Sequence, residues 1–302
     1  MRFEKLREPI SKDQPCGPDL DEEGDEDYIN YIFAAEERLP TRFFDDEQKP
    51  FDKSGIDLDD EVKTIGELLE RSRDLRLLTL EARFQILRGE IIGFCECVTA
   101  CTQLTEKFWN HVHPGADGDM QLRQNTVASL DSLITCVLPM QFAPIVRDRR
   151  EGDISYRVYA VATGDVTPAE EEKVKSPAAV TDALGNAGNS EVVEATFNAL
   201  NEMIEAFEKL KSIFIEHVDH EFVPFFDQIT EAAQQLIKLI GKARPDLAGE
   251  KSTDDDETGD ERENEEDSTD IADGSTPAAA AGADAQPGKM DDVPSHSAAQ
   301  AA

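Results

Sequence analysis

Two pairs of histidines are the residues of this sequence whose types and spacing come closest to those of a reactive site. His111 and His113 lie in the stretch FWNHVHPGADGD, where a following aspartate could orient His113 as a general base. His217 and His220 lie in EHVDHEF, where i, i+3 spacing and acidic neighbours resemble a set of zinc ligands. A zinc-binding or hydrolytic enzyme that uses either pair is therefore one hypothesis.

The surroundings of the first pair favour a structural interpretation. The sequence contains no HExxH motif, and no serine or cysteine stands in a nucleophile elbow. His111 and His113 are two residues apart, so they cannot share one face of a helix. Pro114 and Gly115 predict a helix end at this point, where the helix dipole favours an imidazolium. We expect Trp109 to pack in the core while these histidines cover the helix end.

Three of the five cysteines, Cys95, Cys97 and Cys101, crowd one predicted helix. Residues i and i+2 of a helix point about 200° apart, so Cys95 and Cys97 cannot hold one zinc ion together. No second pair of cysteines follows at ligand spacing. An odd number of clustered cysteines is atypical of a disulfide framework. We expect reduced thiols in a helical core, as in a cytoplasmic protein.

The charge and hydropathy of the chain exclude several classes of partner. Its formal net charge is −35 at pH 7, which repels nucleic-acid phosphates and anionic lipids. The N-terminal residues have no apolar region like that of a signal peptide, and no apolar run approaches the roughly 18 residues that span a bilayer. The sequence predicts a cytoplasmic protein with no nucleic-acid partner and no direct membrane insertion.

Apolar residues recur every three or four positions along most of residues 1–245, which predicts an all-α fold. Helices are expected over 28–39, 62–72, 75–88, 91–109 and 119–138, with two further helices in 191–245. The signals between them are weaker. ISYRVYAVATG suggests a strand or an extended linker near Val158, a polar piece between Pro168 and Pro177 suggests a helix, and GNAGNS at 185–190 suggests a turn or hinge.

These segments predict four regions of the chain. Residues 1–150 form a helical domain, 151–190 a linker with short elements, 191–245 a helical hairpin and 246–302 a disordered acidic tail. The tail contains 17 acidic and 3 basic residues and almost no large apolar residue, so it cannot bury enough surface to offset its chain entropy. An acidic chaperone that acts through this tail is a second functional hypothesis.

The predicted hairpin carries an apolar stripe that needs a partner surface. Its first helix has apolar residues at heptad-like spacing, and its second helix repeats the three-four pattern. Two isolated helices are only marginally stable, so the hairpin must pack on the N-terminal domain or pair with a second copy. We favour a homo-oligomer, with packing inside the chain as the alternative. The residues predicted for self-association are Phe197, Leu200, Ile204, Phe207 and Phe214.

Four sequence blocks carry a further signal in their order and spacing. They are PCGPDL at 15–20, LLERSRDLRLLTL at 68–80, the glycine that closes that helix at Gly89, and FWNHVHPGADGDMQLRQNTVASL at 108–130. Together they resemble the ImpA N-terminal domain, which is shared by TssA-type components of the bacterial type VI secretion system. Each block alone is weakly specific, and their ordered combination carries the resemblance.

The resemblance implies an all-α, non-enzymatic cytoplasmic protein that helps a contractile injection machine assemble, either a short-form member of the TssA family or an accessory relative. TssA-like proteins contact the baseplate and the membrane complex, and some accompany the tail tube and sheath. No catalytic residue, metal ligand or cofactor comes with the family. The family-motif residues are Gly17, Asp19 and Leu20 in the N-terminal turn, Arg71, Asp74, Leu75 and Arg76 at a helix junction, and Trp109, His113, Pro114, Arg123 and Asn125 around the second turn.

The motif residues also have a physical interpretation. Asp74 precedes a leucine-rich helix, where its carboxylate can cap free N–H groups. Arg71 or Arg76 can pair with nearby acids, and Arg123 could reach back toward the carboxylates of HPGADGD. We expect most of these residues to maintain the fold and some of them to contact a partner.

Overall fold

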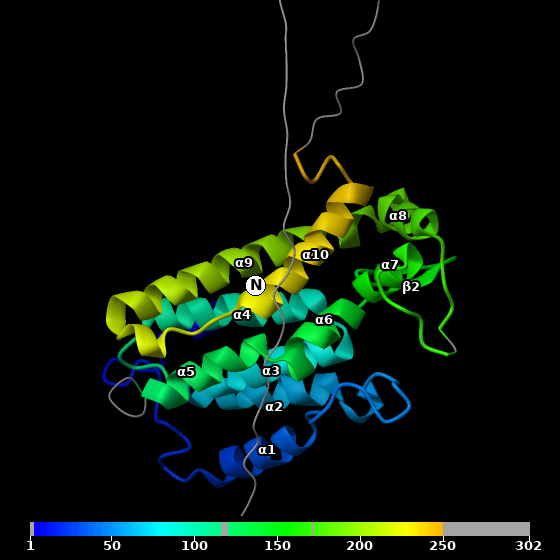
Figure 1. Ribbon diagram of the computed structural model, residues 1–302. Helices are drawn as coiled ribbons and strands as arrows, with labels where there is room; N and C mark the ends of the chain where they lie inside the picture. The colour runs from blue at the N-terminus through cyan, green and yellow to red at the C-terminus, as the bar shows by residue number, and fades with distance from the viewer. Residues whose placement is uncertain (1–2, 116–119, 171, 250–302) are drawn as a thin grey trace, which may run out of the picture. The chain divides into compact units, whose positions relative to one another are not determined.

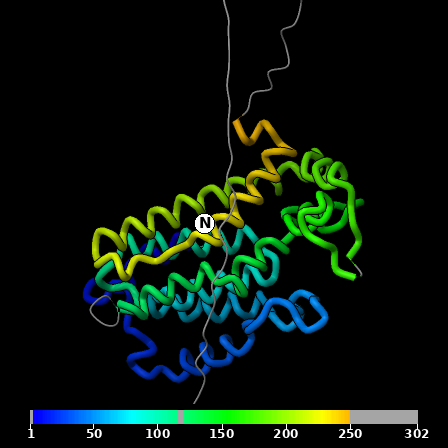
Figure 2. The backbone as a smooth tube through the Cα atoms, in the orientation of Figure 1, coloured from blue at the N-terminus to red at the C-terminus, as the bar shows by residue number. Residues whose placement is uncertain are grey.

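The computed structural model describes residues 3–115, 120–170 and 172–249 (Figure 1, Figure 2). The tail from residue 250 onward, with Asp117 and Asp119 of the second turn, lies outside the described residues. Within the described part, no helix has the length and apolar content to cross a membrane. The α-helices are α1 (Glu26–Glu37), α2 (Leu58–Arg71), α3 (Leu75–Arg88), α4 (Ile91–Lys107), α5 (Met120–Ala128), α6 (Leu138–Phe142), α7 (Tyr156–Thr163), α8 (Pro177–Gly185), α9 (Ser190–His217) and α10 (Asp227–Ala243).

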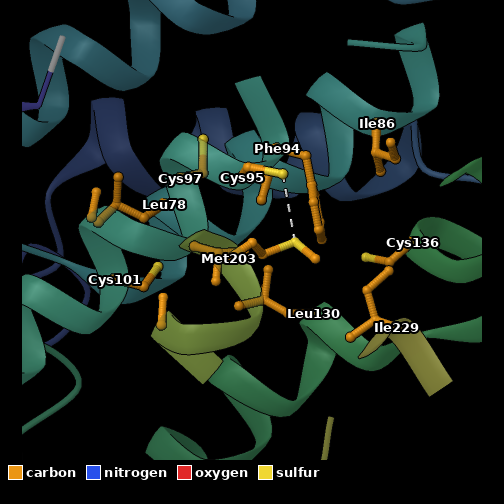
Figure 3. Packing of buried hydrophobic residues seen from close by; sticks show 14 of the residues in the cluster. Leu78, Ile86, Phe94, Cys95, Cys97, Cys101, Leu130, Cys136, Met203 and Ile229 are labelled. Carbon is orange, nitrogen blue, oxygen red and sulfur yellow. Dashed lines mark hydrogen bonds between the residues drawn. The ribbon is translucent and has the colours of Figure 1, made fainter. Parts of the chain in front are cut away.

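Helices α3 and α4 form the centre of this all-α fold. α3 is buried on nearly all sides, and α4 packs between α3 and α9 (Figure 1). The hydroxyl of Thr102 on α4 donates to Ala206 O on α9 at 3.1 Å. Cys95 Sγ lies 3.7 Å from Met203 Sδ across the same contact (Figure 3). The leucine-rich helix expected over residues 75–88 is therefore α3, and its apolar residues are buried on most sides.

All five cysteines are free and buried. Figure 3 shows four of them among leucine, isoleucine and phenylalanine side chains. Burial raises the pKa of Cys136 to about 12, and burial also raises the pKa values of Cys95 and Cys101 above their usual range. The expectation that the clustered thiols are buried in a helical core is confirmed.

The two ends of α3 follow from the residues that flank it. Asp74 caps the start, because its Oδ1 accepts from Arg76 N at 2.8 Å. Gly89 ends the helix with φ +88°, in the left-handed region that favours glycine. A Cβ at Gly89 would lie 3.1 Å from Pro144 Cδ, so this position is also tightly packed.

The single helix predicted over 119–138 is wrong, because the chain breaks it near Ser132. α5 ends at Ala128, a 3-10 turn covers Ser129–Asp131, a π-helical segment covers Leu133–Val137, and α6 follows. Ser132 has an extended backbone and caps the next segment by accepting from Thr135 N at 3.2 Å. Asp131 Oδ1 accepts from Ile229 N at 2.7 Å, where α10 begins. A distant hydrogen bond and a local cap thus replace the helical turn.

The expectation of a strand near Val158 is also wrong. Val158 lies in α7, which Ser155 caps by accepting from Val158 N at 3.3 Å. The strands are β1 (Val146–Asp148) and β2 (Gly152–Ile154), an antiparallel pair that comes earlier in the chain. The helix expected between Pro168 and Pro177 instead begins at Pro177 as α8, where Ser176 caps it. These short caps outweigh the weak strand tendency of the sequence.

Helices α9 and α10 run in opposite senses and are joined by residues 218–226. Arg244 Nη1, just beyond α10, donates to Ser190 Oγ at the start of α9 at 2.9 Å. α9 and α10 are the two helices predicted within residues 191–245, and the second of them starts at Asp227. Phe207 on α9 stacks on Phe226 with ring centres 4.3 Å apart. The apolar stripe of α9 is largely covered inside the chain, by α4 as well as by α10.

Candidate functional site

The family-motif segments, far apart in the chain, meet at one place, which we call the polar junction. It consists of the turn at residues 16–25, the connection of α2 to α3 at residues 71–76, and the loop at residues 109–115 after α4. Arg73 N donates to Cys16 O at 2.7 Å, His113 N to Arg73 O at 3.0 Å, and Leu75 N to His113 O at 2.8 Å. Three of the sequence blocks thus form one structural unit.

Gly17 lets the first segment approach the second closely. Its φ of +71° lies in the left-handed region that favours glycine. A Cβ at this position would lie 2.3 Å from Arg71 O, so any side chain would displace the turn. Beside it, the hydroxyl of Ser72 donates to Pro18 O at 2.7 Å. Position 17 therefore requires glycine for close backbone contact.

Arg76 is the centre of the charged part of the polar junction. Its guanidinium donates to Asp74 Oδ2 at 2.8 Å, to Asp19 Oδ1 at 2.5 Å and to Asp21 Oδ2 at 2.8 Å. The Asp74 side chain is fully buried, and that of Arg76 is 15% exposed. A buried carboxylate without such a partner would be costly, because an unpaired charge away from water is poorly solvated. Arg76 thus allows two acidic segments to meet.

His113 and Asp19 form an ion pair within the polar junction. His113 Nδ1 lies 3.4 Å from Asp19 Oδ2, and its Nε2 lies 3.0 Å from Gly17 O. Burial alone lowers the pKa of His113, but the hydrogen bonds to Asp19 and to the Gly17 carbonyl raise it overall. Burial raises the pKa of Asp19, but hydrogen bonds from His113 and Arg76 outweigh burial and lower it overall. Both ring nitrogens face acceptors, so the imidazolium form is favoured.

The polar junction also holds the first turn of α1. Asp25 caps α1 by accepting from Tyr28 N at 3.0 Å, and its second oxygen forms an ion pair with Arg71. The hydroxyl of Tyr28 donates to Asp74 Oδ2 at 3.1 Å. The guanidinium carbon of Arg76 lies 5.4 Å from the Tyr28 ring centre, within the range of a cation–π contact. Arg71 and Asp74 therefore position α1 as well as the helix junction.

Arg123 is fully buried and holds the loop after α4. Its guanidinium donates to Trp109 O at 2.8 Å, to Val112 O at 2.6 Å and to Pro114 O at 2.7 Å. One planar guanidinium that binds three carbonyls fixes the curve of the loop. The sequence predicted bonds to the carboxylates of this loop. The aspartates in question lie outside the described residues, so that prediction stays a prediction, and the carbonyl bonds are a role of Arg123 that the sequence did not indicate.

Trp109, His111 and His113 all lie in the loop after α4, but they differ in burial and in the residues that they contact. α4 ends at Lys107, earlier than predicted, so these residues lie beyond the helix. Trp109 is buried as expected, and its ring stacks on His217 with ring centres 4.4 Å apart. His111 is exposed. The expectation that His113 covers the helix end is wrong, because the bonds to Gly17 and Asp19 draw it into the polar junction.

The histidine pairs do not form shared sites in this arrangement. His217 ends α9, and His220 begins the 3-10 turn that follows. Within residues 3–115, 120–170 and 172–249, no group of three or more His, Cys, Asp or Glu side chains could hold a metal ion. Both ring nitrogens of His113 are engaged, so the ring as placed has no free lone pair for general-base chemistry.

Of the remaining family-motif residues, Leu20 and Leu75 lie in the core and Asn125 lies on the surface. Leu20 and Leu75 are buried and contribute to the core beside the polar junction. Asn125 is exposed on α5, where its Oδ1 accepts from Gln121 Nε2 at 3.0 Å. Asn125 therefore lies outside the junction that the other motif residues build.

Sequence reasoning assigned no role to several residues that complete the junction, above all Arg73. Its buried guanidinium donates through Nε to Leu6 O at 3.0 Å and through Nη2 to Glu8 O at 3.1 Å. A further bond to Leu69 O closes the end of α2. The signal was the run RSRD between two apolar helices, because charged residues there are buried only when they find partners. The acceptors are main-chain carbonyls, which every residue has, so the sequence does not indicate which of them accept these bonds.

Comparisons with known proteins agree with this geometry. Residues 7–132 match a family model described as ImpA, N-terminal, type VI secretion system. The type VI secretion system component TssA1 of Pseudomonas aeruginosa is 25% identical over 252 residues, which cover 80% of this chain and 69% of that protein. A solved N-terminal domain of TssA from Burkholderia cenocepacia, which includes the conserved ImpA_N region, matches with a TM-score of 0.61 and 21% identity over 81% of this chain and 94% of that one.

The fold and the polar junction define an all-α module of the ImpA N-terminal type. The matched residues contain all four sequence blocks that carried the resemblance. Residues 7–132 thus match the ImpA N-terminal family, and the chain as a whole is similar to TssA components of the type VI secretion system.

Proposed function

We propose that this protein is a non-enzymatic assembly component of the type VI secretion system. It works in the bacterial cytoplasm and contacts baseplate, membrane-complex or tail tube and sheath proteins. The observation that supports this role best is the polar junction, whose charged side chains bind other segments of the same chain. They hold helices in fixed positions, which suits a protein whose surfaces are recognised by partners. The TssA relatives support the same assignment.

The test is deletion of the gene in a bacterium that carries it, followed by complementation. Loss of fluorescent sheath assembly and of tube-protein secretion, both restored by the wild-type chain, is the expected result. Unchanged sheath assembly after deletion contradicts the proposal. A double variant, His111→Ala with His220→Ala, removes one exposed member of each histidine pair and is expected to complement fully. If it folds normally but fails to support secretion, the enzymatic hypothesis is favoured instead.

Self-association through α9 stays a proposal, and the structure narrows the residues that could take part. Leu200, Phe207 and Phe214 have no exposed surface within the single chain. Phe197 and Ile204 are half-buried, so a second copy could reach them while α9 stays on α4. We expect light scattering on the full chain at tens of micromolar to show a dimer or larger species that Ile204→Glu dissociates. Monomers under these conditions would contradict self-association.

The division at residues 150 and 190 into separately folding parts is likewise a proposal. Contacts between α4 and α9 give residues 191–245 a large share in covering the N-terminal core. A chain truncated after residue 189 is a direct test, since α4 would lose its cover. If the truncated chain melts cooperatively and at the same temperature as the full chain, the N-terminal domain folds alone.

A further inference from the structure

The outer face of α1 carries two exposed apolar side chains. Ile29 is 43% exposed and Phe33 is 69% exposed. They are four residues apart on one helix, so they form a single ridge, which we call the α1 ridge. Figure 1 shows α1 at the edge of the helical stack, beside α2. Most of the fold buries its large apolar residues, so an exposed pair in register is a candidate contact surface.

Side-chain hydrogen bonds keep α1 from turning this ridge inward. The opposite face of the helix carries Tyr28, whose hydroxyl donates to Asp74 at 3.1 Å, and Tyr31, whose hydroxyl donates to Glu61 Oε2 at 2.7 Å. Arg38, just after the helix, donates to the same Glu61 oxygen at 3.0 Å. These bonds span the length of α1. A rotation that buried the ridge would break all of them and expose two tyrosine rings.

Acidic side chains surround the α1 ridge. The helix contains Glu26, Asp27, Glu36 and Glu37 and no lysine or arginine. Glu36 is paired with Arg83 at 2.8 Å, and Asp27 lies 3.9 Å from Arg71. Glu26 and Glu37 are exposed. The α1 ridge of a second copy would bring like charges together, which costs free energy. Charge complementarity therefore points to a partner that is positively charged around an apolar centre.

We propose that the α1 ridge docks a basic amphipathic helix of another protein. The apolar residues of that helix pack on Ile29 and Phe33, and its lysines or arginines pair with Glu26 and Glu37. Helices recognise each other through residues three or four positions apart, which is the spacing of the ridge. This proposal depends on the proposed function in one respect, because it takes the partner to be a protein of the secretion system. In this proposal the polar junction supports docking, because Arg71 and Asp74 hold α1 in the orientation that exposes the α1 ridge.

The test uses the purified full chain and a synthetic peptide as the probe. The peptide is about 18 residues long, with leucines on one helical face and lysines beside them, and its binding is measured by fluorescence anisotropy. We expect Phe33→Ser to weaken binding roughly tenfold or more, as for a hot-spot residue. Phe225→Ser is the matched control, because Phe225 is 65% exposed outside α1. It should leave the affinity unchanged, and a scrambled peptide of the same composition should bind weakly.

Three outcomes overturn the proposal: equal binding of the scrambled peptide, equal binding by the Phe33→Ser chain, or an equal loss in the Phe225→Ser chain. A dimer that Phe33→Ser dissociates also overturns it, since the occupant would then be a second copy. Circular dichroism checks that both variants are folded. Peptide binding fails or succeeds independently of sheath assembly in the gene deletion, so failure of the docking surface and failure of the proposed function are distinguishable.

Discussion

Helices α1 and α9 lie at opposite edges of the helical stack, and different interactions hold them there (Figure 1). α9 is attached by apolar packing, because Leu200, Phe207 and Phe214 are fully buried. α1 buries Tyr28 and Ala35 in the core, and it is also held by polar bonds from the hydroxyls of Tyr28 and Tyr31 and by ion pairs at both ends. The comparison shows that polar bonds can hold a helix whose central apolar residues are exposed, whereas α9 buries its central apolar residues and leaves only Val192 and Ile215, near its two ends, among the strongly exposed ones.

The largest change in stability is expected for a substitution that weakens the apolar packing of α9. Phe207→Ala should lower the free energy of unfolding by about 3–5 kcal/mol, because it leaves a cavity between α9, α10 and the core. Guanidinium denaturation of the full chain measures the change. Phe33→Ala on α1 is the control and should change stability by no more than about 0.5 kcal/mol, since Phe33 is mostly exposed. Equal losses in the two variants would contradict the comparison.

The next effect concerns the polar junction that supports α1. Arg76→Met should destabilise the protein by about 2–4 kcal/mol, because Asp74 keeps its buried charge and loses its principal partner. Arg42→Met removes an exposed ion pair with Asp46 and should cost less than about 0.5 kcal/mol. The same denaturation experiment compares the two variants. If Arg76→Met behaves like Arg42→Met, the junction does not stabilise the fold.

A smaller effect isolates one polar bond of α1. Tyr31→Phe removes only the hydroxyl that donates to Glu61, and it should cost about 0.5–1.5 kcal/mol. Hydrogen exchange should become faster for the amides of α1 and stay unchanged for those of α9. Tyr159→Phe, whose hydroxyl accepts from Lys242 on α10, is the matched control and should leave α1 unaffected. Uniform exchange changes in both helices would mean that α1 opens only with the whole fold.

The smallest effect is a dependence of stability on pH. The pKa of His113 is raised above 6.5 in the folded protein, so its contribution is complete below pH 6.5 and is lost as the pH rises through the folded value. The pKa of Asp19 is lowered below 3.8, so its contribution is present above pH 3.8 and is lost as the pH falls. His113→Gln should remove the decline on the alkaline side. The measurement is the melting temperature of the unchanged chain and of His113→Gln between pH 5 and 9. Identical slopes of melting temperature against pH in the two proteins would refute the prediction.

Periodicity in the sequence predicted the helices whose position is set by apolar burial. α3, α4 and α9 were found because their apolar residues recur with the helical period. The predictions near Ser132 and Ser155 went wrong, because single hydroxyl groups cap short segments there. At Asp131 the chain is shaped by a bond to Ile229, 98 residues away. Such a bond has no periodic signature.

The polar junction contains many of the motif residues, but most of their hydrogen-bond partners were not predicted, and their role in function stays a prediction. The sequence blocks pointed to Arg76, His113 and Arg123, and the structure brings all three to the polar junction or the loop that forms it. Their acceptors were harder to foresee, because Arg123 and His113 bind main-chain carbonyls that every residue possesses. Ser72, which donates to Pro18 O across 54 residues, was missed for the same reason.

The burial of every native thiol makes this protein easy to label at a chosen position. An exposed thiolate attacks a maleimide reagent, whereas all five native cysteines are buried in the core. In an Asn30→Cys variant the new thiol, on the exposed side of α1, would be modified alone in the folded chain, and no native cysteine would need to be removed. A dye at that position would report directly when another protein covers the helix.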